Sequence, residues 1–460
     1  MRQLAVFSLA VLTAGMALGQ DLSFGSRYAR QDPGWMNKVT IYELWLNAFS
    51  KEGTLRGAIP GLQRIADLGA NVIYLGPIAK RSETPEASPY SIADYSAIDP
   101  QYGNDQDLHD FVSAAHKLGL KVMLDIVYYH SAPDSVMMKI PNFFVKTADG
   151  KIARGFWPQP LPDYDNPQVR KYLIESLLHW VRDFKVDGFR CDVGAGVPVS
   201  FWDEARKALD QVNPDVIMLS ESDRPDDQLQ AFDINYNFQY YLTLRSVLRD
   251  GEPAIKIRDE WEEMKRTMPE GARLLHFTDN HDWHRAVLEF GEKGAFAASV
   301  LNLTLDGIPF LYNGQEIGDC TPTYWITPDP IHWSQPGNGA DEKTLQQTLA
   351  NYKRLFAMRV KYPALTSGDL IWINNSEPES VLSFVRKKGD EEILVILNLS
   401  NRKTHVTIDL PVMDYYSVQN LLTDGQTWFQ LYSGRVSATL GAYDFVVGKR
   451  IPLAPLEGGQ

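Results

Sequence analysis

Cysteine is scarce in this chain: 460 residues contain two, Cys191 and Cys320, which excludes a disulfide scaffold. Basic residues are also in deficit, because 45 Lys and Arg stand against 58 Asp and Glu, for a formal net charge of -13. This charge makes nucleic acid and anionic membranes poor partners, and we expect neither. Long apolar runs are missing after the first 20 residues, so no later segment is expected to cross a bilayer.

The amino terminus differs from the rest of the chain. Arg2 precedes an apolar stretch at residues 4–18, and small residues stand near its end, at Ala17 and Gly19. This pattern predicts a secretory signal over residues 1–19 that is cleaved to give a secreted or periplasmic protein. A membrane anchor is disfavoured because the stretch is short for a span and contains Gly15.

Short apolar segments alternate with helical periods over most of the chain, which is typical of βα units around a parallel sheet. Segment 121–127 is nearly all apolar, as expected of a strand buried on both faces. Eight strands are predicted, at residues 39–45, 71–75, 121–127, 188–192, 216–221, 231–234, 273–277 and 308–312. The predicted fold is therefore α/β, a (β/α)8 or TIM barrel.

Two regions interrupt or follow this alternation. Residues 131–161 are rich in Pro, Gly and aromatic residues and too long for an ordinary loop, so we predict a short inserted subdomain after the third strand. Residues 364–460 show period-two alternation with turn residues between the segments, which predicts a C-terminal antiparallel β-sandwich domain. The barrel would comprise residues 20–130 and 162–363.

Acidic residues follow the predicted strands at the ends where barrel enzymes carry their chemistry. One strand-end acid is most often a helix cap or a surface residue. Here four strands end in such groups: Asp125, Asp192, Glu221 and the segment 280–282. A metal cluster is the alternative, but Arg190, two histidines and the absence of close ligand spacing favour a glycosidase pair.

Retaining glycoside hydrolysis needs an ionised carboxylate that attacks the anomeric carbon and a protonated carboxyl group about 5 to 5.5 Å away. Asp192 and Arg190 are two residues apart on one strand, so they face the same side, and the guanidinium is expected to lower the pKa of Asp192. Glu221 follows an apolar run, and burial beside a second negative charge is expected to raise its pKa, as a general acid requires.

Six motifs in order resemble those of the α-amylase family, glycoside hydrolase family 13, from about Val39 to the C-terminus. The motifs are Asp-Ile-Val-Tyr-Tyr-His at 125–130, Leu-Pro-Asp-Tyr-Asp at 161–165, Gly-Phe-Arg-Cys-Asp-Val at 188–193, Leu-Ser-Glu-Ser at 219–222, Phe-Thr-Asp-Asn-His-Asp at 277–282 and Gly-Ile-Pro-Phe-Leu-Tyr-Asn-Gly-Gln-Glu at 307–316.

The resemblance implies a role for each candidate residue. Asp192 would be the nucleophile, Glu221 the general acid and base, and Asp282 a third carboxylate that binds sugar hydroxyls. Four further residues would bind the sugar at the cleaved bond, with the first as its stacking platform: Tyr90, His130, Arg190 and His281. The implied activity is hydrolysis of α-1,4-glucosidic bonds in malto-oligosaccharides or starch-type glucans.

The chain departs from the family pattern at two places. Tyr129 stands where the family often has an Asn that helps to bind a structural calcium, so we expect no metal ligands there and no required cofactor. The second motif continues as Gly194-Ala-Gly196, without the Lys-His of many endo-acting amylases. This difference favours short malto-oligosaccharides over long starch chains.

Two alternatives remain open at this stage. One is a transglycosylase or isomerase of the same family, such as a glucanotransferase or a trehalose-forming enzyme, and maltotriose products would distinguish it. The other is a sugar-binding protein without catalysis, whose signature would be loss of a catalytic carboxylate. The sequence has lost none.

Overall fold

The computed structural model describes residues 22–84, 87–323, 325–326, 329–334, 339–410, 416–422, 427–431 and 434–452. The predicted signal segment, residues 1–19, lies outside them. Within the described part of the chain, no helix combines the length and the apolar character that a membrane span requires.

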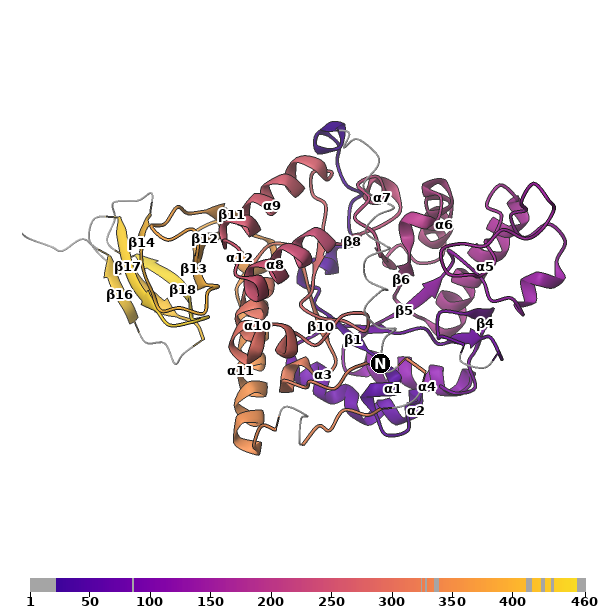
Figure 1. Ribbon diagram of the computed structural model, residues 1–460, viewed down its shortest axis with the longest axis horizontal. Helices are drawn as coiled ribbons and strands as arrows, with labels where there is room; N and C mark the ends of the chain where they lie inside the picture. Colours follow the sequence, from indigo (N-terminus) through magenta and orange to yellow (C-terminus); the bar gives the residue numbers. More distant parts are fainter. Residues whose placement is uncertain are drawn as a thin grey trace, which may run out of the picture.

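Eight parallel strands form a closed barrel, which confirms the predicted fold (Figure 1). The barrel closes where the first strand pairs with the last, with Ile41 opposite Phe310. Each predicted strand overlaps an observed one. The strands are β1 (Ile41–Leu44), β2 (Val72–Leu75), β5 (Lys121–Val127), β6 (Gly188–Asp192), β7 (Ile217–Ser220), β8 (Ile234–Tyr236), β9 (Leu274–His276) and β10 (Ile308–Tyr312).

Helices surround the barrel, and local sequence sets their ends. Asn166 caps α5 by accepting a hydrogen bond from Gln168 N, and Gly69 ends α3 with φ of 103°. Asn104 and Asp107 form a capping box, which sets the start of α4 at Asp105. The longer helices are α3 (Leu62–Leu68), α4 (Asp105–Lys117), α5 (Pro167–Phe184), α6 (Val199–Val212), α8 (Phe238–Asp250), α9 (Ile255–Thr267), α10 (Ala286–Thr304) and α11 (Glu342–Lys361).

The remaining helices are short. They are α1 (Leu46–Phe49), α2 (Leu55–Ala58), α7 (Asp227–Gln230) and α12 (Pro363–Ser367), with 3-10 turns at Leu22–Ser26, Gly34–Lys38, Ile59–Gly61, Val136–Lys139, Gly194–Gly196 and Gln315–Ile317.

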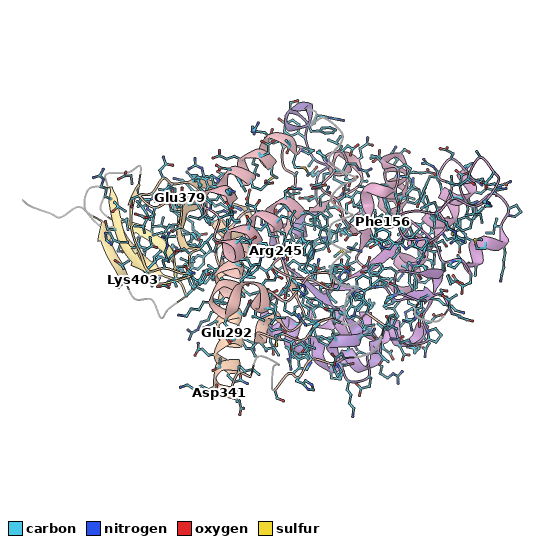
Figure 2. The ribbon with its side chains drawn as sticks, viewed as in Figure 1. Phe156, Arg245, Glu292, Asp341, Glu379 and Lys403 are labelled. Carbon is cyan, nitrogen blue, oxygen red and sulfur yellow. The ribbon has the colours of Figure 1, made fainter. Side chains whose placement is uncertain are left out.

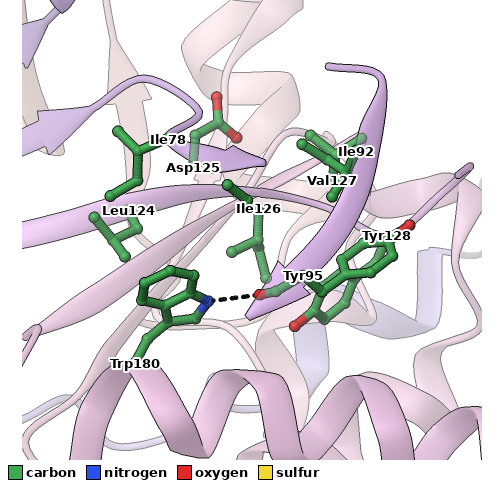
Figure 3. A pocket seen from close by; sticks show the side chains of 10 residues that line it. Ile78, Ile92, Tyr95, Leu124, Asp125, Ile126, Val127, Tyr128 and Trp180 are labelled. Carbon is green, nitrogen blue, oxygen red and sulfur yellow. Dashed lines mark hydrogen bonds between the residues drawn. The ribbon is translucent and has the colours of Figure 1, made fainter. Parts of the chain in front are cut away.

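Strand β5 shows how the barrel separates core packing from chemistry. Leu124 and Ile126 point from the strand toward Trp180 on α5, whereas Asp125 points to the opposite side (Figure 3). Trp180 Nε1 donates a hydrogen bond of 3.1 Å to Tyr95 O, which ties the helix to the neighbouring strand β4 (Ile92–Ile98). The alternation of a strand thus places the apolar residues under the helix and the carboxylate in the barrel.

The predicted inserted subdomain lies between β5 and α5. It contains the 3-10 turn Val136–Lys139 and three isolated antiparallel bridges, Phe144 with Pro162, Lys146 with Ile152, and Arg154 with Pro160. A two-stranded sheet of β3 (Ala79–Arg81) and β4 adjoins it, since Ala132 N donates to Ile92 O.

The C-terminal domain is an antiparallel β-sandwich, as predicted, and lies beside α10 and α12 (Figure 1). Its two sheets enclose an apolar core that includes Leu394 and Ile408. Arg386 joins the domain to the barrel, because its Nη1 donates to Thr304 O at 2.7 Å. The sheets are β11-β12-β13-β18-β15-β16 and β14-β17, with bounds Asp369–Trp372, Val381–Lys388, Glu391–Asn398, Phe445–Pro452, Tyr416–Asn420, Thr427–Leu431, Thr404–Asp409 and Arg435–Leu440.

Candidate active site

Three neighbouring strands bring the predicted acids and Arg190 together. Asp125 on β5 lies opposite Arg190 on β6, and Val127 lies opposite Asp192. Arg190 and Asp192 therefore share one face of β6, as their spacing predicts, while Cys191 between them is buried and a free thiol. Glu221 follows β7 directly.

Arg190 is the centre of this group. Its Nη1 lies 2.9 Å from Asp125 Oδ1 and 2.8 Å from Asp192 Oδ1, and its Nη2 lies 2.6 Å from Glu221 Oε1. The guanidinium is completely buried, and it contacts all three carboxylates with its two terminal nitrogens. Glu221 Oε2 accepts a further hydrogen bond of 2.8 Å from Val193 N. Asp192 and Glu221 are thus held side by side.

The surroundings of Arg190 correct the expected pKa of Asp192. Burial and the negative charge of Glu221 raise the pKa of Asp192 well above its ordinary value, although Arg190 opposes the rise. Burial also raises the pKa of Glu221. The expectation that Arg190 would hold the pKa of Asp192 low is wrong, because burial and the charge of Glu221 outweigh a cation that three carboxylates share. The pair consequently retains a proton more readily than isolated carboxyl groups do.

His281 and Asp282 follow β9 at the same end of the barrel. His281 Nε2 lies 3.2 Å from Asp282 Oδ2, and the Asp282 side chain keeps 33% of its surface exposed. Burial alone would raise the pKa of Asp282, but the positive charge of His281 outweighs it and lowers the pKa. Asp282 is therefore an open, ionised acceptor beside a buried cation, as expected of a group that binds hydroxyls.

Tyr90 joins the two halves of the site. Its hydroxyl lies 2.9 Å from Asp125 Oδ2 and 2.6 Å from His281 Nε2. Its ring is nearly parallel to the His281 ring, with centroids 5.7 Å apart and planes 17° apart. The structure thus places Tyr90 with the other candidates, although most of its surface is buried.

His130 lies at the border between the barrel and the inserted subdomain. Its Nε2 is 3.0 Å from Tyr90 O, and burial lowers its pKa to about 4, so the ring is neutral at neutral pH. The Trp157 ring lies 5.7 Å from the His130 ring. Phe156, the residue before Trp157, is 62% exposed and is labelled in Figure 2. His130 is thus within the site but contacts no carboxylate that the structure describes.

The family's structural calcium is not supported at Tyr129. The Tyr129 ring packs against Gly155 of the inserted subdomain and Gly196 of the turn after β6, where a Cβ would clash with it. Calcium takes six to eight oxygen ligands, whereas a phenol supplies one neutral oxygen. The described residues contain no group of three or more His, Cys, Asp or Glu arranged for a metal ion. These residues do not fit a calcium ion at this position.

Sequence reasoning missed two residues of the first strand segment. Glu43 lies on β1, and its Oε1 is 2.5 Å from His281 Nδ1. Trp45 stacks on His281 with ring centroids 4.9 Å apart and planes 5° apart. The available signal was the charge of Glu43, because the segment Val39–Trp45 is otherwise uncharged. A carboxylate inside a barrel strand requires a buried partner.

A (β/α)8 barrel that gathers two adjacent carboxylates and a third exposed one at strand ends is the scaffold of a glycoside hydrolase. Comparison with known proteins gives the family. Residues 24–140 and 155–360 match the model of the α-amylase catalytic domain, and residues 372–447 match that of the maltogenic amylase C-terminal domain. The chain belongs to the α-amylase family of glycoside hydrolases, which confirms the resemblance.

Several relatives extend over most of the chain. It is 27% identical to a cyclomaltodextrinase of Geobacillus thermopakistaniensis, over 86% of this chain and 70% of that protein. It is 28% identical to neopullulanase 2 of Thermoactinomyces vulgaris, over 89% of this chain and 72% of that protein. The solved structure of a noncanonic maltogenic α-amylase, AmyB from Thermotoga neapolitana, is 27% identical, with a TM-score of 0.82 over 91% of this chain and 100% of that one.

Proposed function

We propose that this α-glucan hydrolase cleaves α-1,4-glucosidic bonds by a retaining mechanism, with malto-oligosaccharides as its preferred substrates. The observation that carries the proposal is the contact of Asp192 and Glu221 with the two terminal nitrogens of Arg190. Carboxyl groups held side by side suit direct attack on the sugar, for which about 5 to 5.5 Å is needed. An inverting site needs about 6.5 to 9.5 Å to admit a water between them.

The proposed reaction assigns one step to each carboxyl group. Asp192 attacks the anomeric carbon, while Glu221 gives its proton to the leaving glycosidic oxygen. Glu221 then takes a proton from water, which attacks the anomeric carbon and releases Asp192. Burial raises the pKa of Glu221, which supports the first step, because Glu221 must start protonated. Asp282 accepts hydrogen bonds from sugar hydroxyls, and His281 holds Asp282 in place.

The preference for short substrates rests on the turn after β6. Gly194–Gly196 form a 3-10 turn with no long polar side chain to hold sugars beyond the cleaved bond. Relatives named cyclomaltodextrinase, neopullulanase and maltogenic α-amylase support an α-glucan as the substrate.

Maltotriose distinguishes this proposal from its alternatives. Hydrolysis predicts glucose and maltose alone, with the newly formed reducing end in the α configuration when it is first observed by proton NMR. Longer oligosaccharides would identify a transglycosylase, and trehalose would identify an isomerase. A product first seen as the β anomer would refute the retaining mechanism.

We also propose that the protein is exported after removal of residues 1–19. The support is the early Arg2 followed by the apolar stretch at residues 4–18. Amino-terminal sequencing of the exported protein tests this, with a start near Gln20 expected.

A further inference from the structure

We propose that Glu43 is a positioning residue, which holds His281 with both ring nitrogens protonated so that the ring fixes Asp282 for its contact with sugar hydroxyls. The inference rests on the proposed function for the role of Asp282, but the state of the histidine can be measured without any substrate. Glu43 lies on β1, far in sequence from the other site residues.

The contact between Glu43 and His281 is short and buried. Oε1 and Nδ1 are 2.5 Å apart, and both side chains are almost completely buried. Among the described residues, no group hydrogen-bonds the second oxygen, Oε2. The histidine is therefore the one described hydrogen-bond partner of this buried carboxylate, and an uncompensated charge at this depth would be costly.

The other ring nitrogen also acts as a donor. His281 Nε2 lies 2.6 Å from Tyr90 Oη and 3.2 Å from Asp282 Oδ2. Tyr90 has one hydroxyl proton, which it donates to Asp125 Oδ2 at 2.9 Å. Because Asp125 is ion-paired to Arg190, it is an acceptor, and the Tyr90 oxygen must accept the proton of Nε2. Both nitrogens thus carry hydrogen, which makes the ring an imidazolium.

Charged and titratable groups approach His281 from several elements. Glu43 on β1 faces Nδ1, while Asp282 and Tyr90 face Nε2. Tyr74 on β2 presents its ring edge-on at 6.5 Å. Burial alone would lower the pKa of His281, but the charges of Asp282 and Glu43 outweigh it and raise the pKa well above its ordinary value.

The ring has little freedom to turn away. Trp45 covers one of its faces at 4.9 Å, and Trp325 Nε1 donates to His281 O at 3.1 Å. Stacking on Trp45 fixes the plane of the His281 ring. The contact of Nδ1 with Glu43 then fixes the direction in which the opposite nitrogen, Nε2, points. The Nε2 proton is thereby aimed at Tyr90 and Asp282.

The test is histidine NMR of the full-length protein, labelled with nitrogen-15 and assigned by the loss of one signal in His281→Asn. In the wild type, the His281 ring should stay doubly protonated through neutral pH. In Glu43→Gln, the amide can still accept from Nδ1 but carries no charge, so the pKa of His281 should fall by about 1 to 3 pH units.

The matched control is Glu316→Gln, which removes the charge of another buried glutamate whose Oε1 instead accepts a hydrogen bond from Tyr42 at 2.8 Å. The His281 titration should stay unchanged in this variant. A wild-type His281 that titrates near 6.5 would overturn the proposal even if Glu43→Gln fails to fold. An unchanged titration in Glu43→Gln would overturn it as well.

Kinetics then connect the ring to the reaction. Relative to the wild type, kcat/KM of Glu43→Gln should be constant below the new pKa of His281 and fall about tenfold per pH unit above it, because a His281 ring that has lost its Nε2 proton cannot donate to Asp282. An equal loss at every pH would show a merely structural role and contradict the proposal. If the protein does not cleave α-glucans, the NMR result still stands or fails on its own.

Discussion

Replacement of Arg190 by Met removes the cation that three carboxylates share. Asp125, Asp192 and Glu221 all lie within 2.9 Å of its terminal nitrogens, and the guanidinium is fully buried. Removal of one partner from a buried ion pair costs about 3 to 5 kcal/mol of stability. Arg190→Met should therefore lose at least about this amount at pH 8, which corresponds to a fall of roughly 3 to 5 °C in the unfolding temperature of a chain of this length.

The loss should depend on pH in a defined direction. Without Arg190, the pKa values of Asp192 and Glu221 in the folded protein rise further above the ordinary carboxyl value of about 4. The folded variant then binds more protons than its unfolded chain, so its stability falls as pH rises above about 4. Each additional proton bound accounts for about 1.4 kcal/mol per pH unit. The deficit relative to the wild type should be smaller at pH 5 than at pH 8.

Differential scanning calorimetry of wild type and variant at pH 5 and pH 8 measures both effects. Arg435→Met is the matched control, because Arg435 pairs with Asp409 while both side chains are about two-thirds exposed, and it should change the unfolding temperature little. A loss in Arg190→Met that is equal at the two pH values would refute the assignment of Arg190 as the compensating charge. An Arg190→Met variant as stable as the wild type at pH 8 would refute this assignment more directly.

Two further predictions concern catalysis and metal. Asp192→Ala and Glu221→Gln should each abolish turnover of maltotriose and leave the circular dichroism spectrum unchanged, because each removes one half of the double displacement. Activity that survives in Asp192→Ala would contradict the mechanism. A calcium chelator should leave the unfolding temperature nearly unchanged, since the Tyr129 ring fills the space beside Gly155 and Gly196. A large fall would show that calcium is bound elsewhere.

Patterns within single segments predicted most of the fold. The strands of the barrel are short apolar runs, and each is bounded by local signals such as Gly69 after α3 or the Asn166 cap of α5. Apolar periodicity identifies the buried face of a helix rather than its first turn, so the start of α4 depends on the capping box of Asn104. The domain boundaries and the roles of the site residues stay predictions.

The site was less accessible to sequence reasoning. Strand-end acids could be found because a barrel places those ends together. The partner of Glu43, by contrast, is 238 residues away, and only the closure of the barrel brings β1 near the segment after β9. The charge balance at Asp192 could not be predicted either, because it depends on how many carboxylates share Arg190. Spacing along one strand identifies one neighbour of a guanidinium and not the other two.

The covalent intermediate is the central claim, and Glu221→Gln with α-maltosyl fluoride tests it most directly. Fluoride leaves without a proton, so Asp192 can still attack, whereas the second step lacks its general base. Mass spectrometry of the rapidly quenched protein should show one added maltosyl group, which peptide mapping places on Asp192. Release of β-maltose without an adduct, or an adduct on another residue, would contradict the mechanism.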